Sequence, residues 1–71
     1  MERYWIDTEV TDGKWQLHKV EDGVEEIVSE GRWPEDAISG GYTPAREEAI
    51  WEEVNSQIEK DLGFVPYYDI N

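Results

Sequence analysis

The sequence contains no cysteine, few basic residues and no long apolar run. Without cysteine the chain can form no disulfide, and it cannot build a zinc site from thiolates. Nucleic-acid-binding surfaces and proteins attracted to anionic membranes carry clustered lysine and arginine. Six bases in 71 residues therefore argue against nucleic acid and membrane as direct partners. No segment matches the apolar core of a signal peptide or a membrane span, so we expect a soluble, cytoplasmic protein.

Acidic residues dominate what is present. Eighteen Asp and Glu residues against six bases give a net charge of −12. Residues 1–33 hold nine acids and four bases, and residues 34–71 hold nine acids and two bases. Negative charge therefore covers the whole chain and is not confined to an acidic tail. A chain of this length forms one small domain, 1–71, whose nine aromatic residues must supply much of the core.

The first thirty residues show the patterns of β-strands and turns. Residues 3–10 alternate between two faces with period two, which predicts a half-buried strand. Asp12-Gly13 is a strong hairpin signal, and a second strand follows over 15–20. Another turn at 21–23 leads to a third strand, 24–29. The result is a three-stranded antiparallel meander.

The second half predicts one long helix. Region 31–42 contains a proline and a pair of glycines, which favour a single helical turn or a loop over the sheet. Thr43 is typical of an N-cap, Pro44 of the first helical position, and Gly63 of a C-terminal cap. Pro66 restricts the last residues to an edge strand or a docked tail. We therefore predict an α+β fold, with the meander packed against one long C-terminal helix and a short C-terminal edge strand or tail.

The predicted helix has an apolar stripe and an acidic ridge. Five apolar residues fall on one side of the helix and are expected to face the sheet: Ile50, Trp51, Val54, Ile58 and Leu62. Glu48, Glu52 and Glu59 lie within about 40° of one another around the helix, and we call these three residues the helix ridge. Glu48 and Glu52 are a like-charge i,i+4 pair, which costs about 0.2–0.5 kcal/mol. No base lies among them, so the ridge is uncompensated.

No residue pattern indicates catalysis or a bound cofactor. His18 is the only histidine, and in a strand we expect it to be a packing or surface residue. The serines lack the G-x-S-x-G context of a nucleophile, and phosphate-binding glycine patterns are absent. The segment from Asp7 resembles a calcium-binding loop only superficially, because its twelfth position is His18 rather than glutamate. We therefore expect no enzyme, no cofactor and no metal site.

The order of elements, with Tyr42-Thr43 before the helix and Glu48-Ala49 inside it, resembles small β-β-β-α modules of bacteria and phages. These modules include the arm-type DNA-binding domain of phage integrases, whose sheet enters the major groove. The resemblance implies the fold. It does not carry the DNA-binding role, because the integrase sheets are basic, whereas this sheet has Glu25 and Glu26.

In size and charge alone, the chain also resembles the acidic anti-restriction and anti-CRISPR inhibitors of phages, which often imitate DNA. This resemblance implies a basic protein surface as the partner, such as the nucleic-acid-binding groove of a host defence complex. The protein would then act in the host cytoplasm.

The expected partner-binding residues form three sets. The helix ridge supplies charge, with Glu25, Glu26 and Glu30 (the sheet acids) as a second patch. Exposed aromatics supply anchors that charge alone lacks. The candidates are Trp5, Trp33 and either Tyr67 or Tyr68, whereas Trp15 and Trp51 are expected in the core.

Two alternatives stay open. The carboxylates of an acidic, halophilic-type accessory protein would only solvate its surface, with no basic partner. A homodimer would bury aromatic residues that the small core leaves exposed.

Overall fold

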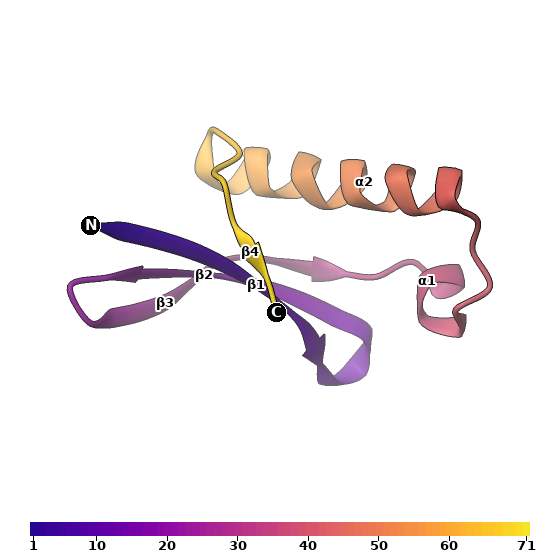
Figure 1. Cartoon of the computed structure of the whole chain (residues 1–71), viewed down its shortest axis with the longest axis horizontal. Helices are drawn as coiled ribbons and strands as arrows, with labels where there is room; N and C mark the ends of the chain where they lie inside the picture. Colours follow the sequence, from indigo (N-terminus) through magenta and orange to yellow (C-terminus); the bar gives the residue numbers. More distant parts are fainter.

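Three antiparallel strands and one long helix make up most of the chain (Figure 1). The computed structural model describes all residues, Met1–Asn71. Strands β1 (Glu2–Val10), β2 (Lys14–Glu21) and β3 (Val24–Arg32) form the predicted meander. Helix α2 (Pro44–Leu62) lies along one face of the sheet, and strand β4 (Asp69–Ile70) completes the order β3-β2-β1-β4. The predicted α+β architecture is confirmed.

Left-handed backbone conformations make the two turns of the meander tight. Asp22 and Gly23 both have positive φ, at 52° and 80°, and they form the two-residue connection between β2 and β3. The first turn contains a 3-10 helix, η1 (Thr11–Gly13), in which Asp12 and Gly13 each have φ of 67°. Strand β3 continues to Arg32, three residues beyond the predicted end, because its pairing with β2 persists to that point.

The core lies between α2 and one face of the sheet. Ile6 and Leu17, which pair across β1 and β2, are completely buried, and Trp15 is 2% exposed. From the helix, the buried residues are Ile50, Val54 and Ile58, with Trp51 and Leu62 half-buried beside them. Gly31 faces Trp15 across β2 and β3, and a methyl group at that glycine would lie 2.7 Å from the indole ring. The predicted apolar stripe is therefore the face that packs on the sheet.

Both ends of α2 are fixed by the residues that the sequence indicated. The Thr43 hydroxyl accepts a hydrogen bond from the Arg46 N–H at 3.2 Å, and Pro44 is the first helical residue. Gly63 ends the helix with φ of 85°. Before α2, the short helix α1 (Glu35–Ser39) provides the single helical turn that was one of the two predictions for this region.

The C-terminal segment returns along α2 to the edge of the sheet. Tyr68 donates a hydrogen bond to Asn55 on α2 at 2.7 Å, and β4 pairs in parallel with Trp5 and Ile6 of β1. The Thr8 N–H donates to the Asn71 side chain at 2.9 Å. The tail is therefore both docked and paired as an edge strand. No helix has the length and apolar character needed to cross a membrane.

Candidate functional site

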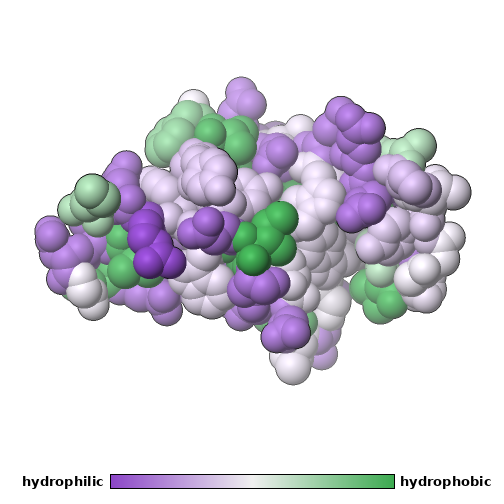
Figure 2. All heavy atoms as spheres, viewed as in Figure 1, coloured by the Kyte–Doolittle hydropathy of each residue, from purple (hydrophilic) through white to green (hydrophobic).

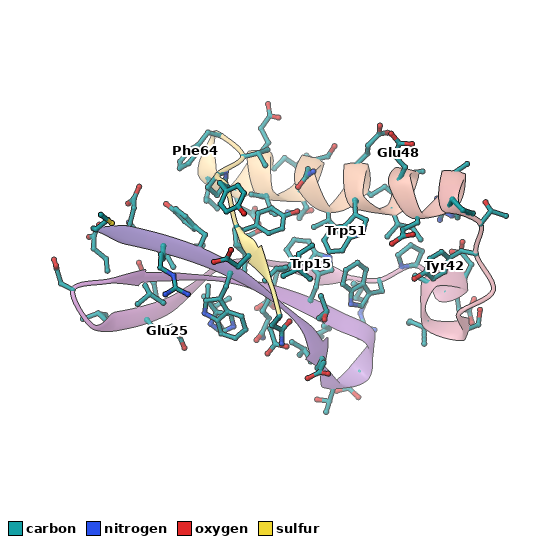
Figure 3. All side chains as sticks on the ribbon, viewed as in Figure 1. Trp15, Glu25, Tyr42, Glu48, Trp51 and Phe64 are labelled. Carbon is teal, nitrogen blue, oxygen red and sulfur yellow. The ribbon has the colours of Figure 1, made fainter.

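The helix ridge lies on the side of α2 that faces away from the sheet. Because Ile50, Val54 and Ile58 point into the core, the geometry of the helix directs Glu48, Glu52 and Glu59 toward solvent. All three are exposed, and Figure 3 shows Glu48 above the helix. None of them makes an ion pair or a side-chain hydrogen bond within the chain. The ridge is a row of uncompensated carboxylates.

Two of the three sheet acids lie on the opposite side of the molecule. Glu25 and Glu30 lie on the face of β3 opposite to α2, since they pair with Val20 and Gln16 on the outer face of β2. Glu26 follows Glu25 in the strand and therefore points to the other face. Figure 3 shows Glu25 below the sheet and Glu48 above the helix. The ridge and Glu25 therefore face in opposite directions, and the second predicted patch is divided between the two faces of the sheet.

Glu25 also has partners within the chain, in contrast to the ridge. The Trp5 indole N–H donates to Glu25 at 3.0 Å, and the His18 Nδ1 lies 3.8 Å from the same carboxylate. The Trp5 ring stacks on His18 with centroids 4.3 Å apart and an interplanar angle of 11°. Trp5 is half-buried in this arrangement. Its indole is therefore engaged within the molecule rather than free as an anchor.

Two other carboxylates are held by hydrogen bonds that join elements of the fold. The buried Ser29 hydroxyl donates to Asp61 at 2.7 Å, and Gln57 donates to the same carboxylate. Both hydrogen bonds lower the pKa of Asp61, and the bond from Ser29 has the larger effect. The Arg46 side chain donates two bonds to Asp36, at 2.7 and 3.2 Å, and lowers the pKa of Asp36. Both acids connect layers of the structure: Asp61 joins α2 to β3, and Asp36 joins α1 to α2.

Exposed apolar side chains gather in the C-terminal segment. Four of the nine exposed large hydrophobic residues of the chain come from its last eight residues: Phe64, Val65, Tyr67 and Ile70. Tyr67 is 88% exposed, whereas the neighbouring Tyr68 is half-buried against Asn55. Figure 2 shows hydrophobic colour over the loop that follows α2 and again where β4 lies. Of the predicted aromatic anchors, Tyr67 is the one that stands free in solvent. We call these four residues the tail strip.

The helix ridge and the tail strip border each other. A shallow depression between α2 and the tail is lined by Trp51, Asn55, Val65, Tyr67 and Ile70, among others. Asn55 lies three residues after Glu52 and four before Glu59, so all three are neighbours on the helix surface. Through Asn55, the ridge side of α2 is therefore next to an apolar depression.

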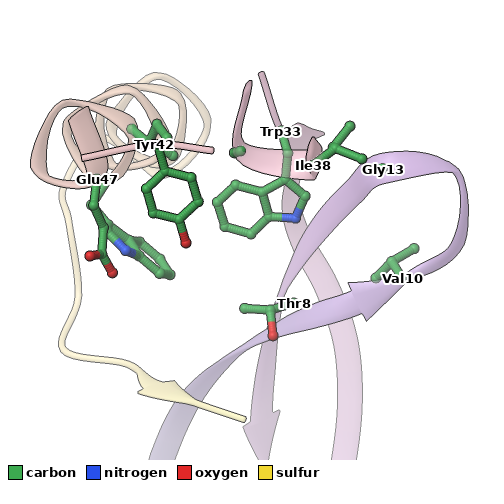
Figure 4. A pocket seen from close by; sticks show the side chains of 10 residues that line it. Thr8, Val10, Gly13, Trp33, Ile38, Tyr42 and Glu47 are labelled. Carbon is green, nitrogen blue, oxygen red and sulfur yellow. The ribbon is translucent and has the colours of Figure 1, made fainter. Parts of the chain in front are cut away.

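Trp33 has a different environment from the one that the sequence indicated. It is half-buried, and its ring meets Trp51 edge to face with centroids 5.5 Å apart. Both indoles line a cavity of about 360 Å³ between α1, α2 and the first hairpin (Figure 4). The sequence contains no signal for this cavity, because its walls come from segments that only the fold brings together.

The described side chains include no cluster of three or more His, Asp or Glu residues placed to hold a metal ion. Comparisons with known proteins supply no relative: no protein-family model, no curated protein and no solved structure matches the chain.

Proposed function

We propose that this protein is a non-enzymatic binding domain that docks onto a basic surface of another protein through the helix ridge and the tail strip. The observation that carries the proposal is the position of these two sets. Three carboxylates without partners, Glu48, Glu52 and Glu59, lie on the outer side of α2. Glu52 and Glu59 are helix neighbours of Asn55, which lines a depression that also contains the freely exposed Tyr67. Contiguous exposed apolar groups on a small protein are typical of interaction sites.

The two sets would contribute to binding in different ways. Carboxylates on a domain with a net charge of −12 attract a basic partner over long range and increase the association rate. Aromatic side chains that become buried at the centre of an interface supply most of the binding energy. Tyr67 is suited to that role, because it is exposed and its neighbour Tyr68 is fixed to α2.

The partner that we favour is a groove that normally binds nucleic acid, such as that of a host defence complex blocked by a phage inhibitor. Glu48 and Glu52 are separated by about 6 Å along the helix axis, and Glu52 and Glu59 by about 10 Å. These separations are comparable with the steps between phosphates of a nucleic-acid strand. The ridge would then act as a DNA mimic, while Glu25, Glu30 and Trp5 lie outside the interface.

His18, the only histidine, supports a binding role rather than a catalytic one. Its Nε2 atom is buried and has no hydrogen-bond partner, and the Trp5 ring covers the imidazole. A general base must come within hydrogen-bond distance of the proton that it removes. In this conformation the Nε2 atom of His18 is closed to a substrate and its Nδ1 atom lies beside Glu25, and no cofactor enters the proposal.

The experiment compares two charge reversals of equal size. One variant carries Glu48→Lys, Glu52→Lys and Glu59→Lys, and the control carries Glu25→Lys, Glu26→Lys and Glu30→Lys. Each change shifts the net charge equally, so general electrostatics cannot distinguish the two variants. Both variants and the unmodified protein are used as baits in bacterial lysate at low and high salt, and the bound proteins are identified by mass spectrometry.

We expect the unmodified protein and the sheet control to retain the same basic protein at low salt, and the ridge variant to lose it. Added duplex DNA should compete with the bait for that protein. If all three baits retain the same proteins, or if only the sheet control loses its partner, the ridge is not the binding surface.

The alternative, a merely solvated acidic surface, is favoured by the presence of carboxylates on both sides of the molecule. A protein of the halophilic type needs salt to fold, because screening reduces its self-repulsion. Circular dichroism at low and high salt separates the two functions. A domain that unfolds at low salt, and that binds nothing at any salt concentration, has the solvating role.

A further inference from the structure

The cavity near the start of α2 combines aromatic rings with a carboxylate. It holds about 360 Å³, and seven of its ten lining residues are apolar. The lining residues used in the argument below are Trp33, Tyr42, Trp51, Ile38 and Glu47. Figure 4 shows the Tyr42 ring between Trp33 and Glu47, with the hydroxyl directed into the opening. The space is large enough for one amino-acid side chain, but it is small for a drug-sized ligand.

Aromatic rings form several walls of the cavity. Trp33 and Trp51 meet at 81°, with ring centroids 5.5 Å apart, so the two indoles form a corner. Tyr42 is 40% exposed and provides a third ring. The faces of indole and phenol rings carry negative charge density and attract a cation that lies within about 6 Å of the ring centre.

Glu47 adds a full negative charge to this aromatic corner. It lies four residues before Trp51 on α2, so the carboxylate and the indole are neighbours on one face of the helix. The carboxylate is exposed and makes no ion pair or side-chain hydrogen bond within the chain. No lysine or arginine lines the cavity. The Glu47 carboxylate is therefore free to pair with a cation from outside the chain.

Contacts between distant segments hold the walls in place. The two hydrogen bonds from Arg46 to Asp36 fix α1 against α2, and the Trp33 N–H donates to the Gly13 carbonyl at 2.8 Å. Ile38 approaches Gly13 so closely that a methyl group there would be 2.7 Å from its Cδ1 atom. The cavity is therefore formed before a ligand arrives, which reduces the entropy cost of binding.

We propose that this cavity binds the guanidinium side chain of an arginine on the partner protein. A guanidinium group is planar and weakly hydrated, so it can stack on an indole while it donates hydrogen bonds to a carboxylate. An ammonium group is more strongly hydrated and has no flat face. The apolar wall at Ile38 suits the methylene groups of the arginine. Trp51 lines both the cavity and the depression at the tail strip, so the arginine would enter next to the proposed interface.

This assignment rests on the proposed function for the source of the arginine, but its chemistry can be tested without a partner. The probes are N-acetyl-arginine methylamide, its lysine counterpart and its citrulline counterpart, which is uncharged and similar in shape. Agmatine, a free guanidinium compound, tests for a small-molecule ligand instead. Binding is followed by NMR through the four tryptophan indole N–H signals, which are assigned by single Trp→Phe variants.

We expect the arginine probe to shift the Trp33 and Trp51 signals in a saturable way, and to leave that of Trp5, on the opposite face of the sheet, unchanged. The citrulline probe should produce no saturable shift, and the lysine probe should bind about threefold or more weakly. Equal shifts from arginine and citrulline would show an apolar pocket without selectivity for charge. Saturation by agmatine alone would identify a free metabolite as the ligand. Either result overturns the proposal, as does the absence of any saturable shift.

Glu47→Gln tests the carboxylate. Glu35→Gln is the matched control, because Glu35 is an exposed acid in the first turn of α1, as Glu47 is in that of α2, and it does not line the cavity. Both residues are exposed, so both variants should fold as the unmodified protein does. The first change should weaken the arginine probe about threefold or more, and the second should leave its affinity unchanged. If both variants bind the arginine probe equally weakly, the effect comes from the overall charge of the protein, and the proposed site is wrong. The ridge reversal described above changes no residue that lines the cavity. If that variant loses the partner protein but still binds the arginine probe, the two proposals are tested independently of each other.

Discussion

The helix ridge and the sheet acids are equal in number and charge, yet their surroundings differ. Glu25 accepts a hydrogen bond from Trp5 and lies beside His18, and all three sheet acids belong to β3, which is an edge strand. Charged residues on an edge prevent its unpaired backbone groups from pairing with another sheet. The ridge has no partner and protects no edge. Its like charges destabilise the helix slightly, without a compensating gain inside the domain.

This difference shows that net charge alone does not locate a binding surface. Carboxylates that have a structural role within the monomer do not require a binding partner to explain them. The sheet acids have such a role at the edge of β3. The ridge acids have none, and they border the exposed tail strip. The repulsion among the ridge acids has no explanation inside the domain, so the ridge is the better candidate for a partner-binding surface.

The largest effect should come from removing the charge of the sheet acids. Glu25→Gln, Glu26→Gln and Glu30→Gln together leave the edge of β3 without repulsion, so we expect concentration-dependent association through edge pairing. The matched variant, Glu48→Gln with Glu52→Gln and Glu59→Gln, should behave as the unmodified protein does. Sedimentation velocity over a wide range of concentration measures both. If the two variants remain equally monomeric, the edge explanation fails and the two patches become equivalent again.

Two aromatic substitutions sharpen the same contrast at a smaller scale. Trp5→Ala removes the stack on His18 and the bond to Glu25, so we expect a loss of roughly 1–2 kcal/mol in the free energy of unfolding.

Tyr67→Ala removes an exposed ring and should change stability by less than about 0.5 kcal/mol. Its effect should be on partner affinity, with a loss of more than about 1 kcal/mol. Urea unfolding and binding titrations of both variants test this, and a large stability loss from Tyr67→Ala would place that ring in the core instead.

The smallest effect concerns a carboxylate that belongs to neither patch. Because Ser29 lowers the pKa of Asp61, that hydrogen bond stabilises the fold when the carboxylate is ionised. The contribution is present above the unfolded pKa of about 4 and is lost as the pH falls through the lower pKa of the folded state. Ser29→Ala should therefore lower the melting temperature at neutral pH, and the difference from the unmodified protein should shrink below about pH 4.

Ser56→Ala, at an exposed position of α2, is the control for that measurement and should change the melting temperature little at any pH. A difference between Ser29→Ala and the unmodified protein that stays constant down to strongly acidic pH would mean that Asp61 does not depend on the Ser29 hydroxyl.

Local rules explain why much of the fold could be predicted. The limits of α2 follow from the capping properties of Thr43, Pro44 and Gly63, each of which acts on its immediate neighbours. The turn at Asp22-Gly23 follows from the tolerance of these residues for positive φ. The end of β3 was predicted too early, because the polar residues up to Arg32 carry no apolar alternation and their pairing with β2 extends the strand.

The site could be predicted only in part, because it depends on which faces meet. The outward direction of Glu48, Glu52 and Glu59 follows from helix geometry, and these residues are exposed as expected. The separation of Glu25 from the ridge depends on which face of the sheet receives α2. The environment of Trp33 likewise depends on Trp51, which lies eighteen positions later in the chain. The pattern of residues in the sequence contains no signal for either of these arrangements.

The amino-acid sequence by itself determined the elements, the buried stripe of α2 and the anionic ridge, because each arises from interactions over a few residues. The tertiary structure alone decided that the tail strip lies beside that ridge, that Glu25 has partners of its own, and that Trp33, Tyr42 and Trp51 surround a cavity with Glu47. The physical reason is the packing of α2 and the tail on one face of the sheet, which brings distant segments together in order to bury Ile6, Leu17 and Ile58.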